Sequence, residues 1–127
     1  MPDNSATLHE PPDVLGPQVI DQHRAIASIM EELEAVDWYN QRAKATANPE
    51  LRAILEHNRD EEKEHAAMVL EWLRRGDPKL NQHLRTYLFT EAPVTEIETA
   101  AIEGGGGEPA ASSDGSLDIG SLRQVKK

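Results

Sequence analysis

Apolar residues recur at helical spacing along two long segments of the chain. In the first segment a helix is predicted to begin between Asp13, a possible N-cap, and Pro17, and to run to about Ala45. Placed at about 100° per residue, its apolar side chains fall on one arc, namely Val19, Ile26, Ile29, Met30, Leu33 and Val36. The pattern predicts an amphipathic helix with one face turned toward a core.

A second helix is predicted after a short break at Ala47, Asn48 and Pro49. Asn48 suits the N-cap and Pro49 the first helical position, while Gly76 supplies the C-terminal stop. The apolar arc of this second helix contains Leu51, Ile54, Leu55, Val69, Trp72 and Leu73. Because the connection is so short, the two helices are expected to form an antiparallel hairpin.

A short third helix is predicted next. Asp77 and Pro78 repeat the capping pattern, and the helix is expected to end before Pro93. Its apolar residues lie at helical spacing, at Leu80, Leu84, Tyr87 and Leu88. The sequence therefore predicts an all-α fold built from a two-helix hairpin and one shorter helix.

The chain divides into four predicted segments. Residues 1–12 hold three prolines and are expected to be a disordered N-terminal arm, whereas residues 13–91 form the helical domain. Residues 92–116 are acidic and glycine-rich and are expected to be a flexible linker. Apolar residues then return in a C-terminal peptide, residues 117–127.

Composition adds two constraints to this picture. A helical domain of this size, in a chain with only five aromatic residues, buries little apolar surface, so oligomerisation is expected. The chain has no Cys, which excludes a disulfide framework, a thiolate zinc site, an iron–sulfur cluster and covalent haem attachment. A reducing cytoplasm is the compartment that this composition suits.

The charge balance bears on the partners of the protein. The formal net charge is −10, with 23 acidic residues against 13 Lys and Arg. A surface of this sign attracts cations and argues against nucleic acid as a partner. No apolar run is long enough to span a bilayer, and the N-terminus lacks the features of a signal peptide, so no membrane partner is expected.

The second helix carries polar residues on its apolar arc. The helical wheel places Asn58, Glu62 and His65 inside the arc and Glu61 toward its edge. A carboxylate directed into a core costs several kcal/mol unless it is paired, protonated or bound to a metal. Since His65 lies three residues after Glu62, both side chains can reach one metal ion from the same face. Glu62 is the predicted ligand, with Glu61 as the alternative.

The first helix presents two acidic faces. Glu32 lies at the edge of the apolar arc, and Tyr39, seven residues later, lies nearly above it. Glu31, Glu34 and Trp38 point to the other side and are assigned to a solvent-facing or secondary interface cluster. The inner face therefore offers a second carboxylate beside the predicted ligands of the neighbouring helix.

These ligands make half of a di-iron site. Carboxylate-bridged di-iron bundles use four helices, two with a single Glu and two with Glu followed by His three residues later. This chain supplies one helix of each kind, so two chains related by a twofold axis are expected to complete the bundle, with the metals at the interface. Folding and metal binding are then linked to dimerisation, and the metal-free protein should dissociate more readily.

Three runs of sequence resemble a known family. They are MEELEAVDWYNQR from Met30, HNRDEEKEHAAMVLEWLRR from His57 and HLRTYLFTE from His83, and the similarity covers about Val14 to Glu91. On these runs the chain resembles the encapsulated ferritins, half-ferritin cargo proteins of bacterial and archaeal encapsulin shells. The resemblance implies a ferritin-like four-helix bundle formed by a homodimer, and dimers assembled into a decameric ring.

The same resemblance implies a function. It is that of a ferroxidase, which oxidises Fe(II) to Fe(III) with oxygen at two irons held in each dimer interface, inside an encapsulin nanocompartment of the cytoplasm. The implied catalytic and metal-binding residues of each chain are Glu32, Glu62, His65 and the nearby Tyr39. Glu31 and Glu34 fall where the family has an outer metal-attracting site. The product iron is stored as mineral within the surrounding shell.

The C-terminal peptide gives a separate indication. In the run LDIGSLR, the apolar residues suit an extended peptide bound in successive pockets, although the residues alone favour a disordered tail. The run resembles the cargo-loading peptides of encapsulin systems, with Asp118 where Thr is common and residues 124–127 beyond the usual end. The resemblance implies binding to the shell protein through Leu117, Ile119, Gly120, Ser121 and Leu122.

Two other functions fit the same residues. In a non-enzymatic helical adapter, Glu62 and His65 form a hydrogen-bonded pair between chains and the tail recruits the protein to a shell. In another di-metal bundle, the same ligands serve an enzyme that handles oxygen or peroxide, or bind manganese or zinc. Metal content and the comparison of iron oxidation with peroxide turnover distinguish these alternatives from a ferroxidase.

Overall fold

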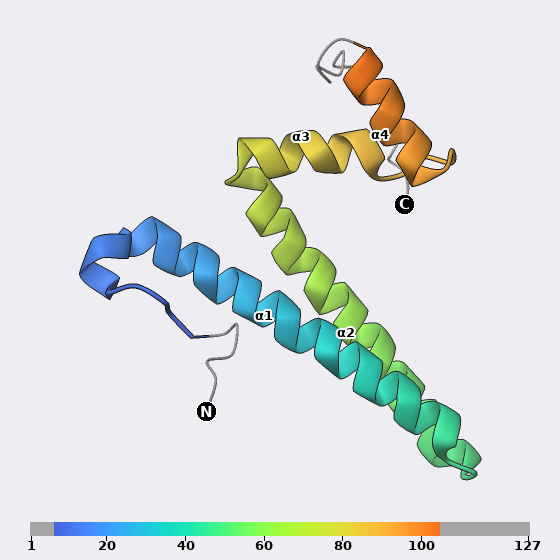
Figure 1. Ribbon diagram of the computed structural model, residues 1–127. Coiled ribbons are helices and arrows are strands. Elements are labelled where there is room, and N and C mark those ends of the chain that lie inside the picture. Colours follow the sequence, from blue (N-terminus) through green and yellow to red (C-terminus); the bar gives the residue numbers. More distant parts are fainter. Residues whose placement is uncertain (1–6, 105–127) are drawn as a thin grey trace. The chain divides into compact units, whose positions relative to one another are not determined.

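A computed structural model describes residues 7–104 of the chain (Figure 1). The elements are α1 (Pro12–Ala45), α2 (Pro49–Arg75), α3 (Pro78–Tyr87) and α4 (Val94–Glu103). Within this described range there is no strand, which confirms the all-α prediction. The chain divides into two compact units, one ending at Gly76 and the other beginning at Asp77.

Helix α1 starts with a break in its first turns. Gly16 has φ 80° and ψ 164°, so the helical conformation is interrupted there and resumes at Pro17. Glycine adopts such a backbone conformation without steric cost, and proline suits the first position of the renewed helix. The helix begins at Pro12, so Asp13 lies in its first turn and is not the N-cap, and only the renewed helix at Pro17 falls at the predicted start. The helix ends at Ala45, as predicted.

The capping residues of α2 and α3 confirm the predicted boundaries. The Asn48 side chain accepts a hydrogen bond from the Leu51 N–H at 2.9 Å, and Pro49 is the first residue of α2. Asp77 accepts in the same way from the Leu80 N–H at 3.0 Å. Each side chain satisfies an N–H group that has no partner within the helix, which is worth about 1 kcal/mol.

The hairpin of α1 and α2 is closed by an arginine at its turn. The two helices run antiparallel along much of their length (Figure 1). Arg52 Nε donates a hydrogen bond to the Ala43 carbonyl oxygen at 2.9 Å, and the Arg52 guanidinium also donates to the Thr46 carbonyl oxygen. Further along, Arg59 donates to Asn40 Oδ1 at 3.1 Å. These bonds fix the position of α2 relative to the end of α1.

The described chain buries very little on its own. Its only buried apolar residues in the range 7–104 are Ala43 and Ala66. Much of the apolar arc predicted to face a core is exposed, on α1 at Val19, Ile26, Met30 and Leu33 and on α2 at Leu51, Ile54 and Trp72. The expectation of a small core is therefore confirmed, and a long apolar stripe runs along the hairpin.

The second unit contains a helix that the sequence did not predict. The flexible linker expected from residue 92 instead begins with α4, which lies against α3. Pro93 precedes the helix, and Ile97 and Ala101, four residues apart, are its partly covered apolar positions. The apolar residues of this segment thus have helical spacing despite its acidic composition. The rest of the predicted linker and the N-terminal residues 1–6 lie outside the described range.

No described helix combines the length and the apolar character that a membrane span requires.

Candidate metal centre

Three metal-ligating side chains converge between α1 and α2. Glu32 of α1 and Glu62 and His65 of α2 each offer one ligand atom, and these atoms lie within 4.8 Å of one another. The separation suits ligands of a shared metal ion or of two neighbouring ions. The structure thus brings together the three residues that the sequence predicts as ligands.

The pair on α2 is joined loosely. His65 Nδ1 lies 3.4 Å from Glu62 Oε1, which is long for a hydrogen bond between a nitrogen and an oxygen. In the single chain the Glu62 side chain is 26% exposed and the His65 side chain 46% exposed. Both groups therefore keep electron pairs that are free to bind a metal ion from the open side of the hairpin.

Glu32 supplies the strongest indication of a missing partner. Its Oε1 is buried and lacks a hydrogen-bond partner within the part of the chain that the structure describes. A buried polar atom without a partner costs about 1–3 kcal/mol, and more when it is charged. A cation bound between Glu32, Glu62 and His65 removes this cost, so the residues present fit a metal site.

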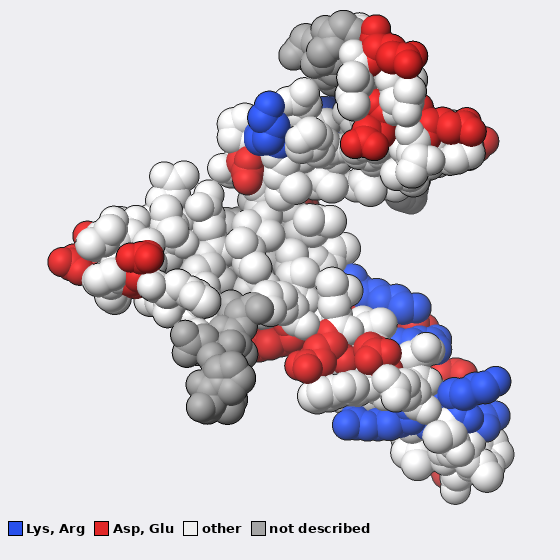
Figure 2. Space-filling view, in the orientation of Figure 1, with Lys and Arg blue, Asp and Glu red and all other residues white. Residues whose placement is uncertain are grey.

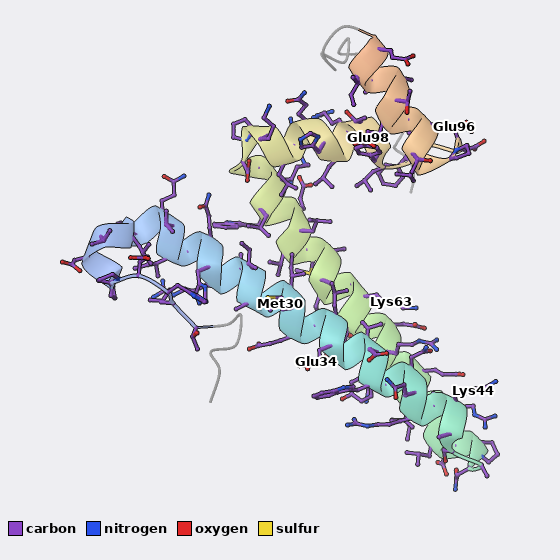
Figure 3. All side chains as sticks on the ribbon, viewed as in Figure 1. Met30, Glu34, Lys44, Lys63, Glu96 and Glu98 are labelled. Atoms are coloured by element: carbon purple, nitrogen blue, oxygen red, sulfur yellow. The ribbon has the colours of Figure 1, made fainter. Side chains whose placement is uncertain are left out.

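Glu61, the alternative to Glu62, lies outside this group. Its Oε2 is 3.7 Å from His57 Nε2, and both side chains are at least half exposed. Lys63 and Glu64 also face solvent, and Lys63 is labelled in Figure 3. The structure therefore favours Glu62 over Glu61 as the carboxylate directed between the helices.

The other predicted residues of α1 occupy two different surroundings. Tyr39 is half-buried, whereas Glu31 and Glu34 are exposed, and Glu34 is labelled on α1 in Figure 3. Among the described residues, neither Glu31 nor Glu34 belongs to the group formed by Glu32, Glu62 and His65. Trp38 lies on the same outer side and is 49% exposed.

One contact was not predicted from the sequence. The guanidinium carbon of Arg42 lies 5.9 Å from the ring centroid of Trp38 and 5.7 Å from that of Tyr39. The signal was present in the spacing, because residues three and four apart on a helix are neighbours. Arg42 therefore contacts one aromatic ring from each of the two acidic faces of α1.

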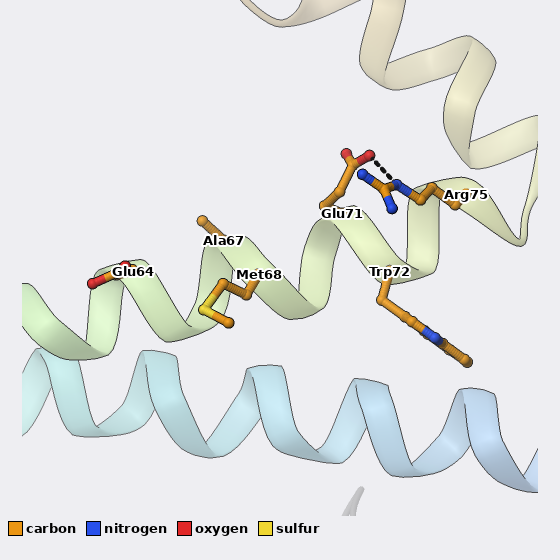
Figure 4. A pocket seen from close by; sticks show the side chains of 6 residues that line it. All are labelled: Glu64, Ala67, Met68, Glu71, Trp72 and Arg75. Carbon is orange, nitrogen blue, oxygen red and sulfur yellow. Dashed lines mark hydrogen bonds and ion pairs between the residues drawn. The ribbon is translucent and has the colours of Figure 1, made fainter. Parts of the chain in front are cut away.

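A second carboxylate group lies further along α2. Hydrogen bonds from Arg74 and Arg75 lower the pKa of Glu71 from 4.5 to about 2. Glu71 lines an open hollow of about 460 Å³ whose walls come from α2, at Glu64, Ala67, Met68, Glu71, Trp72 and Arg75 (Figure 4). None of the predicted ligands lines this hollow.

Charge is unevenly distributed over the visible face of the hairpin. Figure 2 shows Lys and Arg gathered toward the end that carries the turn, with Asp and Glu grouped nearer its middle. Along the sequence of α1, Glu31, Glu32, Glu34 and Asp37 precede Arg42 and Lys44. A negative field at the middle of the hairpin raises the local concentration of cations.

Comparison with known proteins identifies the family. The family model described as EncFtn-like matches residues 7–91, which include both hairpin helices, α3 and all the predicted ligands. The chain belongs to the EncFtn-like family. The resemblance to encapsulated ferritins inferred from the sequence is thereby confirmed.

Relatives of this EncFtn-like chain extend the comparison. It is 62% identical to the encapsulated ferritin-like protein of Rhodospirillum rubrum, over 97% of this chain and 92% of that protein. It is 34% identical to the encapsulin nanocompartment cargo protein EncC of Myxococcus xanthus, over 76% of this chain and 80% of that protein. A Nitrosomonas europaea protein of known crystal structure is 59% identical, with a TM-score of 0.67 over 68% of this chain and 96% of that chain.

The predicted targeting residues of this EncFtn-like chain, Leu117, Ile119, Gly120, Ser121 and Leu122, lie outside the described range.

Proposed function

We propose that this EncFtn-like protein is a ferroxidase. It oxidises Fe(II) to Fe(III) with oxygen at a di-iron site formed between two chains, and it delivers the product for mineral storage in an encapsulin shell. The observation that carries the proposal is the convergence of Glu32, Glu62 and His65 within 4.8 Å, with one buried Glu32 oxygen left without a partner in the described structure.

The donor set suits iron as a substrate. Carboxylate oxygens are hard, anionic ligands and one imidazole completes the set, a combination that binds Fe(III) more strongly than Fe(II). Ligands with this preference lower the free-energy cost of removing an electron from iron. The electrons pass to oxygen, and the oxidised iron leaves for mineralisation.

A second copy of the chain completes the site in this proposal. The exposed apolar stripe of the hairpin, which includes Ile26, Met30, Ile54 and Trp72, requires a covering surface. A twofold axis along the stripe covers it with the same stripe of the partner and doubles the three ligands. Further assembly of these dimers into a decamer is the arrangement that the family resemblance implies.

Two other groups of α1 have supporting roles. Glu31 and Glu34, exposed on the outer face, attract Fe(II) toward the interface. Tyr39 is half-buried on α1, the helix that also carries Glu32, and there it hydrogen-bonds a ligand carboxylate or supplies an electron transiently. The role of Glu31 and Glu34 is the one that the family resemblance implies, and the role of Tyr39 is inferred from its place seven residues after Glu32 on the same helix.

Iron oxidation tests the proposal directly. Purified protein is mixed with Fe(II) without oxygen, oxygen is then admitted, and the formation of Fe(III) is followed by absorbance. We expect Glu32→Ala, Glu62→Ala and His65→Ala each to lower the rate at least about tenfold, because each removes a ligand. The matched control is Glu61→Ala, a neighbouring carboxylate that should retain the rate of the unmodified protein.

The outcome also separates the alternatives. Ligand variants that oxidise iron as fast as the unmodified protein would contradict the proposed site. A protein that purifies without stoichiometric iron and shows no oxidation is a non-enzymatic adapter. A protein that turns over peroxide faster than it oxidises iron is a different di-metal enzyme.

The cargo role rests on the relatives and on the tail. The Myxococcus xanthus relative carries the name of a nanocompartment cargo protein, and the run LDIGSLR from Leu117 resembles a loading peptide. Deletion of residues 117–127 should abolish co-purification with an encapsulin shell protein while leaving iron oxidation in solution unchanged. Loading that survives the deletion would refute the assigned role of the tail.

A further inference from the structure

We propose that Arg42 is a positioning residue that holds Trp38 and Tyr39 in place and makes both rings harder to oxidise. The proposal deepens the proposed ferroxidase function, because it concerns which groups near the site surrender electrons. It does not require Arg42 to touch iron or oxygen. Its basis is the contact of one guanidinium with two aromatic rings.

The geometry of this contact follows from helical spacing. Arg42 is four residues after Trp38 and three after Tyr39, so one side chain can lie against both rings. The two distances from its guanidinium carbon, 5.9 Å and 5.7 Å, lie within the range of about 6 Å in which a cation is attracted to a ring face. Such contacts restrict the rotamers of both rings.

Each ring lies on the same side of α1 as one acidic group. Tyr39 is seven residues after the predicted ligand Glu32, so the two side chains lie nearly in line along the helix. Trp38 stands in the same relation to Glu31 and one turn beyond Glu34. Arg42 is therefore the cation shared by the ring next to the inner site and the ring next to the outer site.

The charge of Arg42 opposes electron loss from these rings. When an indole or a phenol loses one electron, the ring acquires positive charge, and the N–H or O–H proton then passes to solvent. A guanidinium against the ring face repels that charge and raises the free energy of the oxidised ring. With the rings protected, iron remains the easier source of the electrons that oxygen accepts.

An alternative account assigns Arg42 to the helix end. Arg42 and Lys44 both lie in the last turn of α1, where positive side chains interact favourably with the helix dipole. Lys44 has the same charge, and among the described residues the ring contacts recorded involve Arg42 alone. Lys44→Met is therefore the matched control for Arg42→Met.

The test uses the metal-free full-length protein and hexachloroiridate(IV), an oxidant that takes one electron from a ring and becomes hexachloroiridate(III). A Trp72→Phe background leaves Trp38 as the only tryptophan. The rate of oxidant loss is measured by stopped flow, and mass spectrometry locates the oxidised residue. We expect Arg42→Met to raise the rate of oxidation at Trp38 and Tyr39 about fivefold. The rate in Arg42→Lys should lie between those of Arg42→Met and the unmodified protein, and the rate in Lys44→Met should equal that of the unmodified protein.

Two results would overturn the proposal. One is equal rates for Arg42→Met and the unmodified protein, and the other is an equal increase in Lys44→Met. NMR spectroscopy of the protein with Arg42 in place adds a check. Rings that lie against the guanidinium should shift the Arg42 Cδ proton resonances upfield, and Trp38→Leu should remove part of that shift. Since no iron is present, these results are independent of whether the protein is a ferroxidase.

Discussion

Two carboxylates of helix α2, those of Glu62 and Glu71, have different surroundings. Arg74 and Arg75 bind the Glu71 carboxylate at 2.7 Å and 2.6 Å, and together they lower its pKa to about 2. Glu62 has only the loose contact with His65 at 3.4 Å, and the neighbouring Glu32 keeps an unpartnered buried oxygen within the described structure. The chain neutralises one carboxylate by itself and leaves the other group open to a cation from outside.

The partners of each carboxylate distinguish a structural ion pair from a candidate binding site on the same helix. A carboxylate satisfied by its own helix contributes to local stability and gains nothing from a metal. A carboxylate group without such partners costs stability until a ligand arrives. Three experiments test this contrast between Glu62 and Glu71.

The largest effect concerns stabilisation by metal. Fe(II) added without oxygen should raise the thermal midpoint of the unmodified protein and of Glu71→Leu, by a free energy of about 2.7 kcal/mol when free metal is about a hundred times Kd. Glu32→Leu should lose this stabilisation, because a ligand is gone. Differential scanning calorimetry measures the shift. Metal stabilisation that persists in Glu32→Leu, or that disappears in Glu71→Leu, would contradict the contrast.

The second effect is opposite in sign for the two carboxylates. In the metal-free protein Glu32→Leu should increase the free energy of unfolding by about 1 kcal/mol, because it replaces an unpartnered buried carboxylate by an apolar side chain. Glu71→Leu should decrease it by no more than about 1 kcal/mol, because its ion pairs are largely exposed. Denaturant unfolding at one protein concentration gives both values. Destabilisation in both variants would show that Glu32 is satisfied without metal.

The smallest effect is a pH dependence that belongs to Glu71. Its pKa is lowered in the folded state from 4.5 to about 2, so its contribution to stability is fully present above pH 4.5 and is lost as the pH falls toward 2. Glu71→Gln should show a shallower loss of stability over this window. Unfolding curves collected across the window, with Glu61→Gln as control, measure the difference, and identical profiles would exclude the ion pair as the cause.

Much of the fold could be predicted because capping residues mark where its helices begin and end. Asn48 with Pro49, and Asp77 with Pro78, act locally, so their effect does not depend on the rest of the structure. Helix α4 could not be predicted from composition, since an acidic segment that leads into glycines hides the helical spacing of Ile97 and Ala101. The interruption at Gly16 requires a backbone angle that the sequence permits without specifying.

The convergence of Glu32, Glu62 and His65 in the candidate site was predicted from the sequence, whereas their role as metal ligands stays a prediction. Glu62 could be preferred over Glu61 because a wheel gives the direction of each side chain relative to the apolar arc. The dimer expected from the sequence implies an apolar face that is exposed in a single chain, but a wheel does not give the exposed fraction of each side chain, such as the 46% of His65. The contact of Arg42 with two rings also depends on side-chain rotamers that spacing alone leaves open.

Arg52, which closes the hairpin turn, also determines how far along the hairpin Glu32 and Glu62 face each other. Arg52 ties the start of α2 to the carbonyl oxygen of Ala43 near the end of α1. Glu32 lies eleven residues before Ala43, and Glu62 lies ten residues after Arg52. At about 1.5 Å per residue the two ligands stand at nearly the same level above the turn. A residue inserted between Glu32 and Ala43 in α1, or between Arg52 and Glu62 in α2, would rotate the glutamate of that helix by about 100° relative to the turn. The two glutamates would then no longer face each other.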